Sequence, residues 1–258
     1  MVRFRKVISM KSPYQLMRLS GSRIRTLRGT LALDGFALVK PLAQGRFGSC
    51  FLVSRDEVRY VLKIFNPNDV KRRKEKLTRE SKLLTRIDHS AIPKLIQVLD
   101  RDGFYGLVME QMPGQSLADL LEWDHIFSKT EITAIMAQLI AVMDYLAGLN
   151  ISHRDIKTDN ILWTGEQLSL IDFGTASGVL RLNSRFNPDC WGLGDVFLRL
   201  AANCYEMAAS SNDFSLAQLN LKPAQREVIE RLLYIKRPYR NFQALTEDFN
   251  HAWLKNTD

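Results

Sequence analysis

One loop, over residues 151–162, gathers most of the side chains that could do chemistry: His153, Arg154, Asp155, Lys157 and Asn160. A lone histidine on an apolar face is usually a satisfied core residue. Here the histidine stands among two cations, a carboxylate and an amide, and apolar segments flank the whole group. Such a density of acid–base and hydrogen-bonding groups indicates a catalytic loop.

A short apolar strand over residues 168–173 ends in Asp172-Phe173-Gly174. A carboxylate at a strand end, together with the amide oxygen of Asn160, offers hard oxygen ligands that suit Mg²⁺ better than zinc. The cysteines Cys50, Cys190 and Cys204 lack C-x-x-C spacing, so they indicate neither a disulfide framework nor a zinc site. We expect free thiols in a reducing compartment.

Two features of the first half could hold a nucleotide. The turn Ala43-Gln44-Gly45-Arg46-Phe47-Gly48 lies between apolar runs, and its glycines would let backbone N–H groups approach phosphates. By itself this pattern also fits an ordinary hairpin turn. Lys63 lies inside an apolar strand and needs a partner, for which Glu80 on the following charged helix is the best candidate. The alternative is a surface pair of negligible energy.

The order of the elements predicts the fold class. Strands are expected over residues 36–41, 50–53, 60–65, 95–99 and 104–109, with one helix over 69–87. Helical patterns follow over 116–122, 130–149, 189–209 and 223–234. A strand-rich lobe joined near Glu110–Pro113 to a helix-rich lobe is an α+β arrangement with a cleft between the lobes. The apolar stretch 132–149 contains Gln138 and Asp144, so we expect a buried helix rather than a membrane span.

The net charge of +8 is unevenly distributed. Residues 1–33 contain eight basic side chains and no acidic one, and the rest of the chain carries 28 of each. The simplest interpretation is a solvated arm that packs loosely on the first lobe. Alternatives are an arm for nucleic acid or an anionic membrane surface, or an organelle transit peptide. No secretory signal is visible at the N-terminus, so a cytoplasmic protein is the default expectation.

The motifs in their order resemble the eukaryotic-type (Hanks-type) serine/threonine protein kinases, over about residues 36–258. The resemblance implies a two-lobed kinase fold, with an N-lobe over about 36–111, a C-lobe over about 113–258 and ATP between them; residues 1–35 form a basic extension. It implies that Lys63, steadied by Glu80, holds the α- and β-phosphates of ATP. Asp155 accepts the proton of the substrate hydroxyl, and Lys157 neutralises the transferring phosphate. Asn160 and Asp172 ligate Mg²⁺, with Mn²⁺ as the alternative.

The resemblance also implies which residues surround ATP. Met109 resembles the gatekeeper, and Glu110–Met112 the hinge that meets adenine through backbone groups. Asp189 resembles the residue that opens the helix bracing the catalytic loop. The complete expected nucleotide set is Leu42, Ala43, Gly45, Phe47, Gly48, Cys50, Val61, Lys63, Met109, Glu110, Met112 and Leu162.

Two departures from the family pattern stand out. Ala43 replaces the first glycine of the loop, which predicts a somewhat stiffer loop. Only residues 175–188 separate Asp-Phe-Gly from the next helix, at most roughly 50 Å of extended chain, and they contain no Ala-Pro-Glu. Arg240 matches the arginine that would pair with the missing glutamate, so it needs another partner or stays exposed. The short segment resembles compact bacterial members of the family.

Several functional alternatives remain at this point. Thr175, Ser177 and Ser184 are the acceptors available for loop phosphorylation, but so short a segment favours constitutive activity or control by a partner. The leading hypothesis is an ATP-dependent kinase for serine and threonine in proteins, including itself. The alternatives are a small-molecule phosphotransferase of the same fold, or an inactive scaffold that uses the basic arm. The intact charged residues favour the first.

Overall fold

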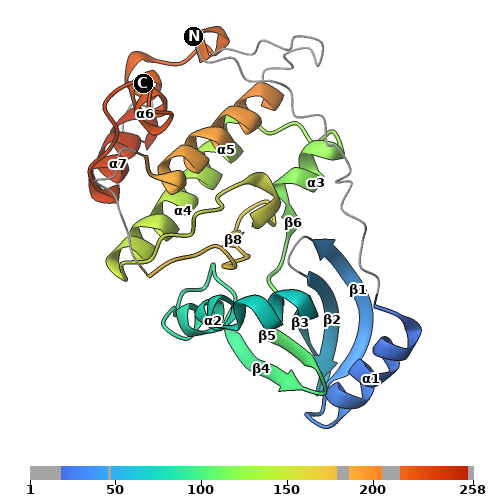
Figure 1. Ribbon diagram of the computed structural model, residues 1–258. Coiled ribbons are helices and arrows are strands. Elements are labelled where there is room, and N and C mark those ends of the chain that lie inside the picture. The colour runs from blue at the N-terminus through green and yellow to red at the C-terminus, as the bar shows by residue number, and fades with distance from the viewer. Residues whose placement is uncertain (1–18, 46–47, 179–185, 205–215, 255–258) are drawn as a thin grey trace. The chain divides into compact units, whose positions relative to one another are not determined.

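The computed structural model describes residues 19–45, 48–178, 186–204 and 216–254 (Figure 1). The chain divides into two compact units, and the division falls between Met112 and Pro113. The unit before this point is rich in strands, and the unit after it is rich in helices. The predicted α+β class, with a strand-rich lobe followed by a helix-rich lobe, is therefore confirmed. The predicted limits of extension and kinase domain, 1–35 and 36–258, stay a prediction.

The first unit is built on one antiparallel sheet with the strand order β1-β2-β3-β5-β4. Its strands are β1 (Ala37–Gly45), β2 (Gly48–Arg55), β3 (Val58–Phe65), β4 (Leu95–Arg101) and β5 (Phe104–Glu110). All five were expected from their apolar runs, and each extends beyond the apolar run that predicts it at one end or both. Most of the extra residues are polar or glycine residues near the turns, which hydropathy alone does not mark as strand; Leu42, Ala43 and Val58 are the apolar exceptions.

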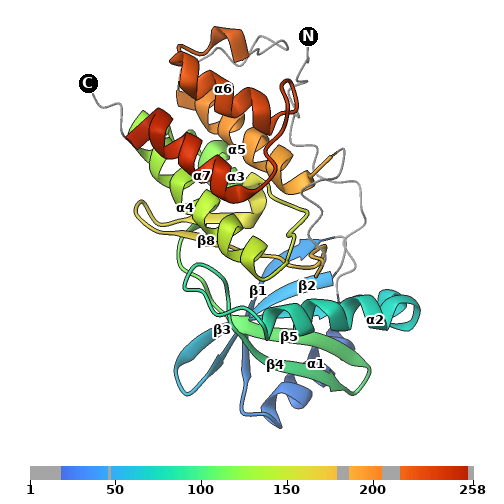
Figure 2. The same ribbon diagram turned by 90° about the vertical axis from the view of Figure 1, so that its left-hand side faces the viewer.

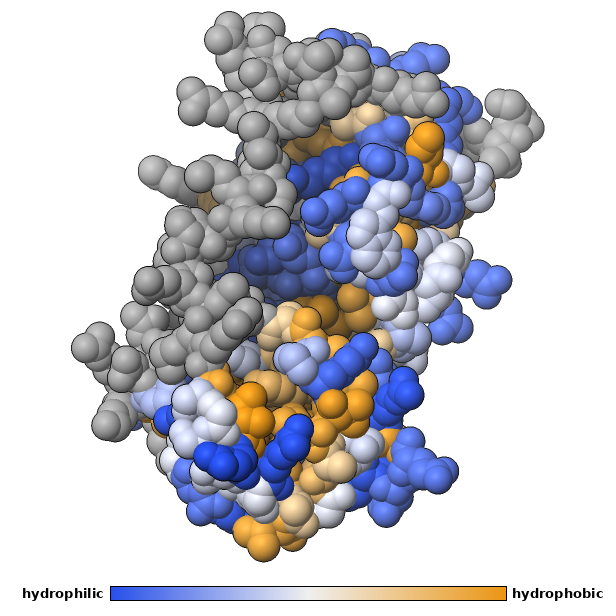
Figure 3. Space-filling model, turned by 90° about the vertical axis from the view of Figure 1, so that its right-hand side faces the viewer, coloured by the Kyte–Doolittle hydropathy of each residue, from blue (hydrophilic) through white to orange (hydrophobic). Residues whose placement is uncertain are grey.

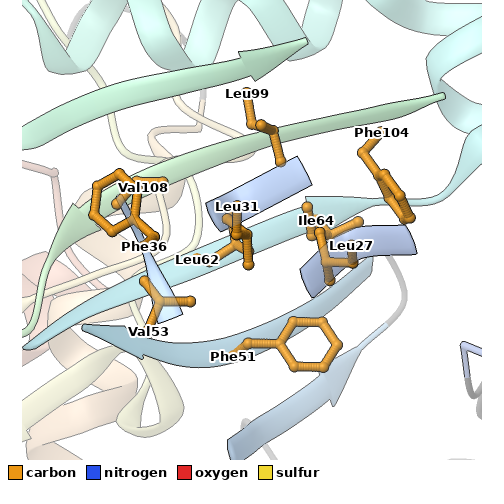
Figure 4. Packing of buried hydrophobic residues seen from close by; sticks show 10 residues of the cluster. All are labelled: Leu27, Leu31, Phe36, Phe51, Val53, Leu62, Ile64, Leu99, Phe104 and Val108. Atoms are coloured by element: carbon orange, nitrogen blue, oxygen red, sulfur yellow. The ribbon is translucent and has the colours of Figure 1, made fainter. Parts of the chain in front are cut away.

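Helix α1 (Gly21–Ala32) covers one face of this sheet, where the sequence suggested a loosely packed arm. Leu27 and Leu31 are fully buried in a cluster with Phe51, Leu62 and other apolar residues of the strands (Figure 4). For residues 21–32 the expectation of a solvated arm is therefore wrong. The basic side chains concealed the helix, because its apolar residues form only a narrow stripe.

Polar contacts fix α1 to the turn between β4 and β5. The Thr30 hydroxyl donates a hydrogen bond to Asp102 Oδ2 at 2.7 Å, and Arg23 donates to the carbonyl of Gly103 at 3.4 Å. The Arg23 guanidinium also lies 4.8 Å from the centre of the Phe104 ring. The helix is thus held both by its buried leucines and by the hairpin turn beside it.

Helix α2 (Pro67–Leu84) follows β3 and begins with proline at its first position, where the missing N–H is not needed. It was predicted over residues 69–87. The structure ends the helix earlier, at Leu84, and Thr85 forms its C-cap. The periodicity of Leu77, Leu83, Leu84 and Ile87 predicts its buried face, and of these Leu83, Leu84 and Ile87 are buried, with Ile87 beyond the helix end.

The second unit contains a small sheet of β6 (Gln115–Ser116), β7 (Ile161–Trp163) and β8 (Leu168–Leu170), in that order. Its helices are α3 (Leu117–Glu122), α4 (Lys129–Gly148), α5 (Pro188–Cys204), α6 (Pro223–Leu232) and α7 (Phe242–Phe249). Short turns of other helix types cover Thr158–Asn160, Leu216–Gln218 and Asn250–Leu254. Helix α7 and the strands β6 and β7 were not expected, because each offers too few residues for a periodic pattern.

Helix α4 is the central helix of the second unit (Figure 2). It packs against α5, α7 and β8. Among the described residues, α4 is the one helix whose length and hydropathy would allow it to cross a membrane. Its apolar residues, among them Ile135, Leu139 and Met143, are buried inside the unit. The prediction of a buried core helix is therefore confirmed.

Candidate active site

Lys63 and Glu80 form a buried ion pair within the first unit. Lys63 Nζ lies 2.8 Å from one carboxylate oxygen of Glu80 and 3.2 Å from the other. The two side chains are 8% and 2% exposed. Because water is excluded, removal of either partner would leave an uncompensated charge. The partner predicted for Lys63 is thus the one that the structure shows.

The sheet register places several of the expected nucleotide residues side by side. Cys50 pairs with Lys63 across β2 and β3, and Ala43 pairs with Cys50 across β1 and β2. Val61, two residues before Lys63, pairs with Met109 on β5. Paired residues of neighbouring strands share a face, and so do residues two apart on one strand. These five residues therefore form one patch on one face of the sheet.

This patch lies on the face opposite to α1. Leu62 and Ile64 of β3 point into the cluster that α1 covers, so Val61 and Lys63 point the other way (Figure 4). The same face of β3 meets α2, because Glu80 reaches Lys63. One face of the sheet therefore serves packing, while the other carries the residues expected to meet ATP.

The other expected nucleotide residues lie at the ends of these strands. Leu42 is exposed on β1, and Gly45 ends that strand. Gly48 opens β2 with a φ of +156°, and a Cβ there would lie 1.9 Å from the carbonyl oxygen of Ile64. Only glycine fits so close an approach. Ala43 is not among the described residues with positive φ, so alanine is accommodated without strain.

The residues expected to form the hinge and to contact adenine divide between the two units. Glu110 ends β5, and Met112 is the last residue of the first unit. Leu162 lies on β7 of the second unit. Phe47 lies outside the described residues.

In the second unit, two neighbours hold the Asp155 carboxylate. Asn160 Nδ2 donates to the Asp155 carbonyl and to Oδ2, each at 2.9 Å. Lys157 Nζ lies 3.1 Å from the same Oδ2. The carboxylate is half-buried, so it is oriented and still accessible. This geometry suits a group that accepts a proton from a bound hydroxyl.

Asp189 is fully buried and anchors the catalytic loop from α5. Its carboxylate accepts hydrogen bonds from the Ser152 hydroxyl at 2.6 Å and from the backbone N–H groups of His153 and Arg154 at 3.1 and 2.5 Å. Arg154 has a φ of +68°, a conformation that costs a non-glycine residue about 1 kcal/mol or more. Three hydrogen bonds to one carboxylate stabilise this backbone. The expectation that Asp189 braces the loop is confirmed.

His153 is held as a neutral imidazole between two hydrogen bonds. Its Nε2 lies 3.2 Å from the carbonyl oxygen of Ile171, so Nε2 carries the proton and donates. Its Nδ1 accepts from the backbone N–H of Asp155 at 3.3 Å. Burial lowers the pKa of His153, although the nearby carboxylates of Asp189 and Asp172 act in the opposite direction. The ring packs edge-on against Phe173, with centroids 4.7 Å apart.

The family model described as a protein kinase domain matches residues 36–192. The chain belongs to the protein kinase family. The probable serine/threonine-protein kinase YbdM of Bacillus subtilis (strain 168) is 31% identical over 238 residues, which cover 87% of this chain and 91% of that protein. Protein kinase 3 of Dictyostelium discoideum is 32% identical over 173 residues, 65% of this chain and 19% of its own length. Calcium-dependent protein kinase 4 of Plasmodium falciparum (isolate 3D7) is 32% identical over 149 residues, which cover 54% of this chain and 28% of that protein. The kinase thus spans most of the bacterial relative and a small part of the other two.

The residues expected to bind metal in this kinase lie at one end of the β7–β8 hairpin. The N–H of Ile171 donates to the carbonyl of Asn160 at 2.9 Å, which brings Asn160 close to the start of Asp172. Asp172 has a φ of +64°, and its Oδ1 accepts from the N–H of Gly174 at 3.2 Å. Because Asn160 Nδ2 bonds to Asp155, the amide oxygen is the atom that can face a cation.

One carboxylate and one amide oxygen fit Mg²⁺, which usually takes one or two protein ligands and completes its shell with phosphates and water. Among the described residues there is no group of three or more His, Cys, Asp or Glu that could hold a metal by itself. The donor set therefore fits a cation that arrives with a nucleotide.

Of the three expected phosphate acceptors, one uses its hydroxyl in a structural contact and one is buried. The Thr175 hydroxyl donates to the carbonyl of His153 at 3.0 Å. Ser177 is buried and pairs with Ser152 through two backbone hydrogen bonds of 2.8 and 2.9 Å. Ser184 lies outside the described residues. Arg154, beside Asp155, is exposed, and so is Arg240, which was expected either to find another partner or to stay exposed.

Two supporting residues of the site were not expected from the sequence. Ser152 adds a hydroxyl to the Asp189 anchor. Asn187 Oδ1 accepts from the N–H groups of Asp189 and Cys190 at 2.8 and 3.4 Å and so caps α5. The pattern Asn-Pro-Asp before an apolar helix is a recognisable start signal. Burial raises the pKa of the Cys190 thiol to about 12, so this cysteine stays protonated and serves packing.

Proposed function

We propose that this kinase transfers the γ-phosphoryl group of ATP to serine and threonine hydroxyls of proteins, with Mg²⁺ as the metal. The observation that carries the proposal is the Asp155 carboxylate, held by Asn160 and Lys157 on a loop anchored to Asp189. The Lys63–Glu80 pair is also formed. No charged group that phosphoryl transfer needs has been lost, which argues against an inactive scaffold.

In the second unit, Asp155 would orient the attacking hydroxyl and accept its proton through the carboxylate. Lys157 would then share its positive charge between this carboxylate and the transferring phosphate. Asn160 and Asp172 would hold Mg²⁺, which, when bound, neutralises the phosphate oxygens. Because the transition state is spread over several oxygens, most of the catalysis comes from positioning and charge.

In the first unit, Lys63 would bind the α- and β-phosphates through its ammonium group. Glu80 holds this ammonium at a fixed point, so little side-chain freedom is lost when ATP binds. The backbone N–H groups of the glycine turn that ends at Gly48 would bind phosphate oxygens.

We propose that the kinase is active without phosphorylation of the segment 175–188. The Thr175 hydroxyl already donates to the catalytic loop, so its phosphorylation would break a contact that supports the site. Ser177 is buried where its backbone pairs with Ser152, so a phosphate there would have to be accommodated without water. Transfer to the kinase itself would then fall on other segments. We place the protein in the cytoplasm, since its three cysteines suit a reducing compartment.

The basic residues 1–33 would add binding to an anionic partner, a nucleic acid or a membrane surface. Arg25 and Arg28 are exposed on α1 and could contribute. Because α1 is part of the core of the first unit, deletion of residues 1–33 would destabilise that unit as well as remove the basic residues. The suitable variant replaces Arg3, Arg5, Lys6 and Lys11 with serine; a salt-dependent gel shift that survives this change would contradict the assignment.

Phosphosite mapping after incubation with ATP and Mg²⁺ tests the main proposal. We expect phosphoserine or phosphothreonine on the kinase and on a generic basic protein, and none with Asp155→Asn. The short segment 175–188 motivates a second candidate, a small-molecule phosphotransferase. Turnover of a metabolite without any phosphoprotein would favour this second candidate and overturn the first.

A further inference from the structure

The loop between α3 and α4 presents two large apolar side chains to solvent. Trp123 is 61% exposed and Ile126 is 57% exposed. Hydrophobic side chains also reach the surface elsewhere, as Figure 3 shows for the lower, strand-rich part of its view, so exposure alone does not mark a site. The loop needs a further feature to be a binding surface, and it has two.

The first feature is a fixed conformation. The N–H of Trp123 donates to the carbonyl of Asp119 at 2.9 Å, and the N–H of His125 donates to that of Leu120 at 3.0 Å. Phe127 is fully buried, and its N–H donates to Asn203 Oδ1 at 2.9 Å. Trp123 and Ile126 are therefore held outward by a loop that is anchored at both ends. A rigid aromatic side chain loses little entropy when a partner covers it.

The anchoring continues into the start of α4. His125 lies 3.2 Å from Glu131 through Nε2, and its ring packs edge-on against Phe127 at 4.6 Å. Glu131 also completes a capping box with Ser128. The partial burial of Glu131 is the largest single influence on its pKa and raises it. The hydrogen bonds to Ser128 and His125 together outweigh burial, so the pKa of Glu131 is lowered. The carboxylate thus stays charged where it holds the loop.

The second feature is charge. Asp119, Glu122 and Asp124 are all exposed around the apolar pair, and no ion pair is formed by any of them among the described residues. Lys129 is the nearest basic residue in the sequence, and it takes part in interactions of its own. Three carboxylates repel nucleic acid and anionic membranes and attract lysine and arginine.

We propose that this surface, formed by Asp119, Glu122, Trp123, Asp124 and Ile126, binds a basic segment of a partner protein that also carries apolar side chains. Trp123 would supply most of the binding energy, since tryptophan is enriched among the hot spots of protein interfaces. The carboxylates around it would speed association and select the positive partner. None of these residues belongs to the active site, so binding is separable from phosphoryl transfer.

The test is a peptide titration with the full chain and without ATP. The probe is a fluorescein-labelled twelve-residue peptide of lysine and leucine, followed by fluorescence anisotropy. We expect Trp123→Ser to weaken binding by about tenfold or more. Glu122→Gln with Asp124→Asn should weaken it and reduce its salt dependence. Asparagine tolerates the left-handed backbone at position 124, where φ is +56°, so the fold should persist.

Matched controls use the same unit. Ile235→Ser removes an apolar side chain of similar exposure, 49%, and Glu166→Gln removes an exposed carboxylate elsewhere. Both should bind the peptide as the unchanged chain does. A second peptide with serine in place of leucine should bind at least tenfold more weakly, as follows from loss of the apolar contact.

Three results would overturn the proposal. One is equal binding by Trp123→Ser and Ile235→Ser, and another is equal binding of the two peptides. The third is a change in sedimentation of the chain alone on Trp123→Ser, because the surface would then join two copies of the kinase.

Discussion

At the scale of single residues, His153 links the pH dependence of folding to the catalytic loop. Burial holds its pKa below the usual value of 6.5. Below about pH 6.5, His153 therefore binds a proton in the unfolded chain but not in the folded chain. The free energy of unfolding decreases as the pH falls. The loss should approach about 1.4 kcal/mol for each further pH unit until the folded pKa is reached.

Thermal unfolding between pH 8 and pH 5 measures this loss. His153→Gln can still donate and accept but does not titrate, so we expect its melting temperature to fall less steeply below pH 6.5 than that of the unchanged chain. Parallel curves for the two proteins would show that His153 is not the responsible group.

The Lys63–Glu80 pair predicts a different stability effect at the same scale. Glu80→Gln leaves the Lys63 ammonium without its carboxylate in a buried place and should lower the free energy of unfolding by about 3 kcal/mol. The exposed pair of Lys94 and Asp88, 3.2 Å apart, is the control, and Asp88→Asn should change stability by less than about 1 kcal/mol. Chemical denaturation measures the free energy of unfolding of both variants. Similar losses in Glu80→Gln and Asp88→Asn would contradict a buried Lys63–Glu80 pair.

Glu80 was predictable from the sequence because a lysine in an apolar strand needs a partner. The sequence has a limit here as well. It could not reach the Thr175 hydrogen bond to the His153 carbonyl, because nothing in the residue types ties these two positions together. Such contacts depend on the course of the backbone rather than on composition.

At the scale of elements, α5 places the catalytic loop through a glycine as well as through Asp189. A Cβ on Gly192 would lie 2.6 Å from the carbonyl oxygen of Ile156, whereas one on Gly194 would meet only the side chains of Leu232 and Leu233. Gly192→Ala should shift the loop and lower kcat by about tenfold or more, with little change in the KM for ATP. Gly194→Ala should affect stability more than kcat.

Steady-state kinetics with melting temperatures separates these effects. Equal losses of kcat in the two variants, at equal stability, would mean that the approach of α5 to the loop is not critical.

Helix α1 is the element that the sequence concealed. Its apolar residues stand among arginines, and hydropathy alone did not distinguish a helix from a basic arm. Leu31→Ala should cost about 2–5 kcal/mol, because Leu31 is 1% exposed in the core of the first unit. Leu33→Ala, two residues away and 70% exposed, is the control and should be nearly neutral. Denaturant unfolding measures both free energies of unfolding. Equal stability of Leu31→Ala and Leu33→Ala would contradict the packing of α1 in the core.

At the scale of the whole molecule, the order of strands, helices and motifs was sufficient to predict a strand-rich unit followed by a helix-rich one. The order of the charged residues along the chain identified the family before any geometry was known. The sequence did not predict the surroundings of Thr175 and Ser177, the two expected acceptors that the structure describes. The two look equally available as residue types, and only the structure shows that the Thr175 hydroxyl donates to His153 and that Ser177 is buried.

The most direct measurement is transfer of radiolabelled phosphate from ATP to the kinase and to a generic basic protein, with Asp155→Asn as the matched variant. The proposed function predicts labelled phosphoserine or phosphothreonine with the unchanged chain and a loss of at least about 10²-fold with the variant, since the proton acceptor is removed. Equal labelling by the two proteins, or none by either, would contradict it.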